Sequence, residues 1–66
     1  MDDIDLWRAA KLLVDEHGTN ASGFAAEWAI HFHEAGDIEA EEVWVRIMTR
    51  VLELQRKKPA DGETQH

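Results

Sequence analysis

At 66 residues, the chain has room for a single domain, which on folding buries only roughly 60% of the surface that the unfolded chain exposes. Hydrophobic residues make up 44% of the sequence and charged residues 32%, a composition typical of a globular domain and not of a disordered segment. The absence of cysteine excludes disulfides and cysteine-ligated zinc, and the net charge of -7 argues against direct nucleic-acid binding.

No stretch approaches the ~18 apolar residues that a membrane-spanning helix requires, and three of the first five residues are acidic. We therefore expect a cytoplasmic protein that does not contact a membrane. Its stability has to come from packing within the chain or from self-association.

A first helix is predicted from about Ile4 to His17. Asp2 or Asp3 can cap its start, and Gly18 can supply the left-handed residue that ends it. Its apolar residues recur with a 3.6-residue period and form one core stripe: Leu6, Trp7, Ala9, Ala10, Leu13 and Val14. Leu12 falls outside this stripe.

A second helix is predicted after a short polar joint and runs to about Ala35. Asn20 or Ser22 can cap its start. Ile30 points away from the core stripe, which contains the following residues: Ala21, Phe24, Ala25, Trp28, Phe32 and Ala35.

The tripeptide 35–37 predicts a tight joint between the second and third helices. Gly36 can adopt positive φ without steric cost, and Asp37 can accept hydrogen bonds from the free amides that begin the next helix. The two helices should then be antiparallel neighbours. The third is expected from Ile38 to about Lys57, because Pro59 opposes continuation.

These elements predict an all-α chain that forms a small three-helix bundle. Residues 1–58 make up the expected domain, and residues 59–66 an expected flexible polar tail. The third helix is longer than the others, and its core stripe contains the following residues: Ala40, Val43, Trp44, Ile47, Val51 and Leu54.

A second apolar flank lies beside the core stripe of the third helix. Val45, Met48 and Leu52 follow i, i+3, i+7 spacing, so the apolar arc is wider than one packing contact requires. Two accounts remain open. Either the first helix covers this flank as ordinary core, or the flank meets a second copy of the chain or another protein.

The three tryptophans, Trp7, Trp28 and Trp44, fall on core stripes, one in each predicted helix. Large rings fill a small core efficiently, so we expect all three in the core. The alternative is a position at the rim of a contact surface, where tryptophan is often found.

The four histidines do not predict a metal site. His31 and His33 are two positions apart on a helix and point in different directions. Glu27, His31 and Glu34 share a helix face, yet they do not form the Glu-x-x-His pairs of carboxylate-bridged metal bundles. We expect neither a metal nor another cofactor.

The sequence also offers few candidate catalytic residues. The chain has no cysteine and a single serine, Ser22, which is better explained as a helix cap. Its four glycines match neither the P-loop nor the dinucleotide-binding pattern. We therefore expect that the protein is not an enzyme.

A series of landmarks spans about residues 6–54: Leu6-Trp7, His17-Gly18, Ala21 with Phe24, Ala35-Gly36-Asp37, and Trp44 with Ile47. Their order resembles a family of short uncharacterised α-proteobacterial proteins classed as a domain of unknown function. The resemblance implies a bacterial, cytoplasmic helical protein and transfers no catalytic or binding residue. The chain departs from the family pattern at Thr19-Asn20, where an acidic residue is expected.

Two hypotheses for function follow. The first is a protein interaction module, an accessory or regulatory subunit that binds a protein partner or a second copy through Val45, Met48 and Leu52. The alternative is an acidic inhibitor, a decoy that occupies the nucleic-acid-binding site of an enzyme through acids such as Glu39, Glu41 and Glu42. Salt should weaken only the second kind of binding strongly.

Overall fold

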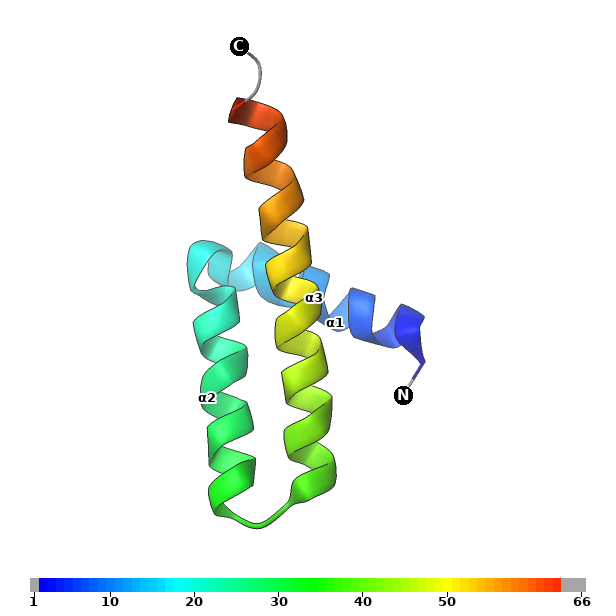
Figure 1. The fold of residues 1–66 in the computed structure, drawn as a ribbon, viewed down its shortest axis with the longest axis vertical. Helices are drawn as coiled ribbons and strands as arrows, with labels where there is room; N and C mark the ends of the chain where they lie inside the picture. Colours follow the sequence, from blue (N-terminus) through cyan, green and yellow to red (C-terminus); the bar gives the residue numbers. More distant parts are fainter. Residues whose placement is uncertain (1, 64–66) are drawn as a thin grey trace.

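The structure, a computed structural model, describes residues 2–63, with side chains for residues 2–56. The prediction of an all-helical chain is confirmed over these residues, which contain no strand. The elements are α1 (Asp3–His17), the short 3-10 helix η1 (Gly18–Asn20), α2 (Ala21–Glu34) and α3 (Ile38–Glu63). α2 and α3 run side by side in opposite directions, and α1 lies across them near the end of this hairpin that is far from its turn (Figure 1).

The turn between α2 and α3 is a Schellman motif. Gly36 has a φ of 81°, the Asp37 N–H donates to the Phe32 carbonyl at 2.9 Å, and the Gly36 N–H donates to the His33 carbonyl at 3.1 Å. The Oδ1 atom of Asp37 then accepts a hydrogen bond from the Ala40 N–H at 3.1 Å and so caps α3. Three residues thus reverse the chain and satisfy amides and carbonyls at both helix ends.

The joint between α1 and α2 differs from the prediction of a side-chain cap. Gly18 ends α1 with a φ of 58°, but Asn20 makes no side-chain cap bond, and Ser22 lies inside α2. A backbone hydrogen bond replaces the expected side-chain cap, because in η1 the Ala21 N–H donates to the Gly18 carbonyl. The same carbonyl accepts a 2.7 Å bond from Nε2 of Gln55, which holds the joint against α3.

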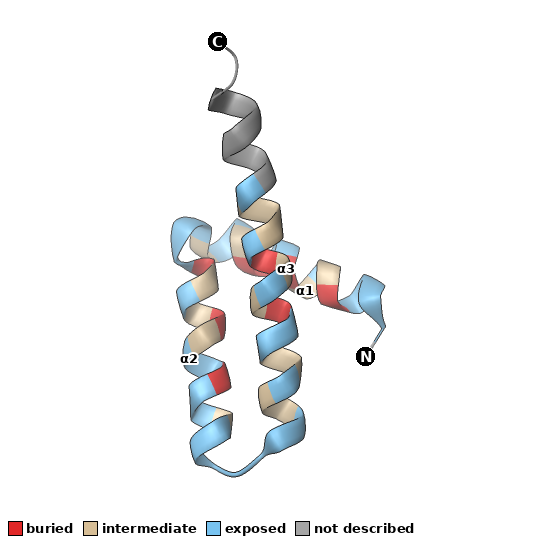
Figure 2. Cartoon of the chain, viewed as in Figure 1, coloured by how far each residue is buried: buried red, intermediate tan, exposed pale blue. Residues whose placement is uncertain are grey.

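The centre of the core combines alanines with larger aliphatic side chains. It comprises Leu6, Ala10 and Leu13 of α1, Ala21 and Ala25 of α2, and Ile47 and Val51 of α3. Alanines at the contacts let helix backbones approach closely, which leaves less room between them for large rings. Buried positions gather where α1 crosses the hairpin and become fewer toward the turn (Figure 2).

The prediction that all three tryptophans lie in the core was wrong. Trp7 and Trp44 are half-buried, and Trp28 is 38% exposed. Their rings lie at the edges of the helix contacts because alanines occupy the closest approach. Ala29, which was not on the predicted stripe, is buried instead.

The predicted end of the third helix near Lys57 was also wrong, because α3 continues through Pro59 to Glu63. Proline removes one backbone hydrogen bond from a helix, yet the helix of the described residues continues past it. The predicted flexible polar tail comprises residues 59–66. The side chains of these residues lie outside the described part of the structure, and residues 64–66 lie wholly outside it. No helix among the described residues combines the length and apolar character needed to cross a membrane.

Candidate interaction surface

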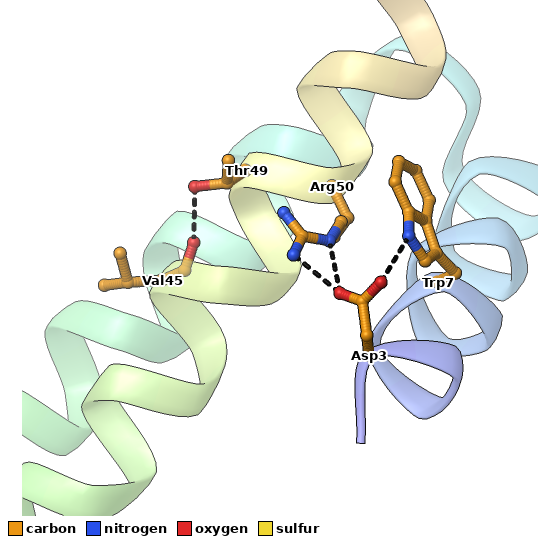
Figure 3. A network of polar contacts seen from close by, with 5 residues as sticks. All are labelled: Asp3, Trp7, Val45, Thr49 and Arg50. Carbon is orange, nitrogen blue, oxygen red and sulfur yellow. Dashed lines mark hydrogen bonds and ion pairs between the residues drawn. The ribbon is translucent and has the colours of Figure 1, made fainter. Parts of the chain in front are cut away.

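The apolar flank of α3 lies on the side of that helix away from α1. Val45 and Leu52 are 40% and 44% exposed, whereas Met48 is half-buried and packs against the edge of the core. Arg50 points toward α1, while Val45 lies on the other side of α3 (Figure 3). The packing of α1 on the hairpin therefore leaves much of the flank in contact with solvent.

A polar network holds α1 in this position. Nη2 and Nε of Arg50 donate to Oδ1 of Asp3 at 2.7 and 3.2 Å, and Nε1 of Trp7 donates to Oδ2 of the same carboxylate at 3.1 Å (Figure 3). The guanidinium also lies 5.2 Å from the centre of the Trp7 ring, which is within the range of a cation–π contact. Hydrogen bonding from Arg50 and its positive charge hold the pKa of Asp3 below the ordinary value of 3.8.

α2 contributes a second apolar row beside the flank. Ile30 is 57% exposed, and Ala26 is half-buried next to the buried Ala29. A shallow groove of about 360 Å³ runs between the two helices, and its lining combines both rows: Ala26, Ala29, Ile30, His33, Glu41, Val45 and Met48. We call the surface formed by Ala26, Ala29, Ile30, Val45, Met48 and Leu52 the open face.

One polar pair lies at the end of the open face nearest the turn. Nδ1 of His33 and Oε1 of Glu41 are 3.1 Å apart and join the end of α2 to the start of α3. Glu41 is the more enclosed partner, since 29% of its side chain is exposed against 71% for His33. Glu41, which the acidic-decoy hypothesis placed on a binding surface, therefore has a structural contact within the chain.

Sequence reasoning missed two residues that extend the apolar surface. Ile30 was read only as pointing away from the core, because the rotation of α2 relative to α3 is not visible in a sequence. Ile38, at the start of α3, is 65% exposed and lines a second shallow groove together with Val45. Its spacing of seven residues from Val45 was the signal that could have identified it.

An aromatic cluster lies elsewhere on the hairpin. The ring of Phe24 stacks on His17 at 4.2 Å and meets the edge of Trp44 at 6.3 Å between centres. Trp28 stacks on Trp44 at 6.0 Å and also contacts His31 at 5.3 Å. These contacts explain the partial burial of the rings, which pack between α2, α3 and the joint that follows α1.

Within the described residues, no group of three acidic, histidine or cysteine side chains is arranged to hold a metal ion. The geometry of this surface suits the burial of apolar side chains against another molecule. Comparisons of the chain with protein-family models, curated proteins and solved structures gave no match.

Proposed function

We propose that the chain is a small three-helix bundle that serves as a protein interaction module, an accessory or regulatory subunit without catalytic activity. It binds protein through the open face. The observation that carries this proposal is the exposure of Val45 and Leu52, at 40% and 44%, in a chain whose first helix packs elsewhere on the hairpin. The resemblance to short α-proteobacterial proteins and a cytoplasmic location are compatible with this role and belong to the same proposal.

The arrangement of the open face supports association more than isolated exposure does. Single apolar side chains on a surface are common, but contiguous apolar patches with a polar rim mark contact sites. Val45 and Met48 line one groove with Ile30 of the neighbouring helix, and the His33–Glu41 pair lies at one end. The patch therefore has the apolar centre and polar rim of a protein interface.

The acidic-decoy alternative has less support. Glu39 and Glu42 are exposed, but Glu41 is half-buried and paired with His33. Acidic residues in the first turn of a helix also interact favourably with its dipole, which explains Glu39 and Glu41 without a partner.

A pair of substitutions tests the proposed function. Val45→Gln with Leu52→Gln replaces two exposed apolar side chains by polar ones and spares Met48, whose contact with the core makes it unsuitable. We expect the helical circular dichroism to stay near that of the wild type, whereas binding of the chain to itself or to a partner captured from its native host is lost.

Leu12→Gln is the matched control, because Leu12 is 60% exposed on α1 and lies outside the open face. Equal binding by the double variant, Leu12→Gln and the wild type would refute the proposal. Binding that survives the double variant but disappears in high salt would favour the acidic decoy instead.

A further inference from the structure

We infer that the occupant of the open face is a second copy of this chain, with the two α3 helices packed antiparallel about a two-fold axis near Thr49. This inference rests on the proposed function, since it names the protein that the open face binds. Its support comes from the spacing of exposed residues on α3, from their charges and from the dimensions of the face.

The exposed apolar residues of α3 follow the seven-residue repeat of a helix–helix seam. Ile38, Val45 and Leu52 are seven positions apart and are 65%, 40% and 44% exposed. Met48, three positions after Val45, flanks the seam on the side of α2. Apolar residues at this spacing stay aligned along a partner helix, as the first and fourth positions of a heptad do in coiled coils.

The charges beside this seam set the direction of the partner helix. Glu42, Thr49 and Arg56 are also exposed and seven residues apart, on the adjacent line of α3. In an antiparallel pair centred on Thr49, Glu42 of each copy lies near Arg56 of the other. A parallel pair would instead bring the two Glu42 side chains together and the two Arg56 side chains together, which opposes association.

This complementarity is what favours a second copy over an unrelated partner. A two-fold interface joins the same patch on both subunits, so each patch must be complementary to itself. The α3 seam meets this condition, because the apolar Val45 and Leu52 lie on either side of the uncharged Thr49, with an acid at one end and a base at the other.

The dimensions of the face also suit a dimer. From Ile38 to Arg56, α3 extends ~27 Å at 1.5 Å per residue, and two adjacent helices span ~20 Å. The flat projection is therefore ~500 Å², and the relief of the side chains raises the accessible area toward the ~800 Å² per subunit of a standard interface. α3 also projects beyond α1 and α2 (Figure 1), which leaves its line of contact unobstructed at that end.

Charge exchange combined with sedimentation equilibrium tests the inference on the full chain. The wild type should show a monomer–dimer equilibrium, and Glu42→Arg or Arg56→Glu alone should weaken dimerisation by about tenfold, because each places like charges together twice. The double variant Glu42→Arg with Arg56→Glu should restore the wild-type dissociation constant, since an antiparallel pair again matches opposite charges. Leu12→Gln serves as a neutral control that should dimerise normally.

A wild type that stays monomeric at every accessible concentration would overturn the inference. So would equal dimerisation by the wild type, both single variants and the double variant, which is the result that a parallel pair predicts, because it places like charges together in all four. If the wild type is monomeric but Val45→Gln with Leu52→Gln still abolishes capture of a different protein, the second copy is rejected while the proposed function stands. If these substitutions affect no association at all, the proposed function fails as well.

Discussion

Gly36 and Gly23 show how the same residue type can have opposite consequences at two positions. An added Cβ would meet no atom within 4 Å at either glycine, so crowding does not distinguish them. Backbone conformation does, because Gly36 has a φ of 81° at the turn, whereas Gly23 lies inside α2.

We therefore expect Gly36→Ala to destabilise the fold by about 1 kcal/mol, through the strain of placing a side chain in the left-handed region. Gly23→Ala should instead stabilise it by about 0.5–1 kcal/mol, because alanine favours the helix. Urea denaturation of the two variants measures both free energies of unfolding. Equal effects of the same sign would show that the turn does not depend on positive φ at residue 36.

Asp3 gives the contact between α1 and α3 a dependence on pH. Its pKa is held below 3.8, first by the hydrogen bond from Arg50, so the folded state favours the ionised carboxylate. A lowered carboxyl pKa contributes stability above 3.8, and this contribution is lost as the pH falls through the folded-state pKa.

Asp3→Asn should accordingly be less stable than the wild type near neutral pH, and the difference should shrink as the pH falls below 3.8. Thermal melts followed by tryptophan fluorescence, with Trp7 near the contact, measure this difference at each pH. A difference that stays constant down to the lowest pH would contradict a role for the Asp3 charge.

Among the secondary-structure elements, α2 depends most on small residues. Its buried positions are Ala21, Ala25 and Ala29, and they set how closely the hairpin packs. Ala26 is adjacent to this row but lines the groove of the open face.

Ala25→Leu should destabilise the chain by about 1–3 kcal/mol, because its position is fully buried and extra methyl groups force side chains or helices apart. Ala26→Leu, which adds the same atoms beside the groove, should have a much smaller effect. Thermal denaturation of the two variants makes the comparison. A larger loss of stability for Ala26→Leu would mean that the core and the open face have been assigned to the wrong sides of α2.

The elements were more predictable from sequence than their packing. Apolar periodicity and residues 35–37 placed the described α-helices and the hairpin turn, because these features depend on local geometry, although α3 extends beyond its predicted end. Periodicity identifies a helix face, but it does not tell which residue on that face lies at the closest approach. Trp28 and Ala29 were misassigned for this reason, and η1 was missed because a segment of 3 residues is too short to show a periodic pattern.

The candidate surface was likewise predictable from the sequence only in part. The α3 flank was visible as an unusually wide apolar arc around Val45, whereas the contribution of Ile30 depends on how α2 is rotated against α3. That rotation follows from tertiary packing, which a single sequence pattern does not contain.

At the scale of the whole molecule, the position of α1 determines which surface remains available. α1 packs across one side of the hairpin and is linked to α3 through the Asp3–Arg50 contact, while the open face lies on the other side. In the proposed function, one side of the hairpin contributes to the core and the other side binds protein. α1 completes the core, and α2 with α3 presents the apolar surface.

Methyl NMR of the chain tests most directly the claim that the open face is the binding surface. Spectra are compared between the free state and the associated state, reached by raising the concentration or by adding a partner. The account predicts shifted or broadened methyl signals at Ile30, Val45 and Leu52, with those of Ile4 and Leu12 on α1 unchanged. Changes confined to Ile4 and Leu12, with the open-face signals unmoved, would contradict it.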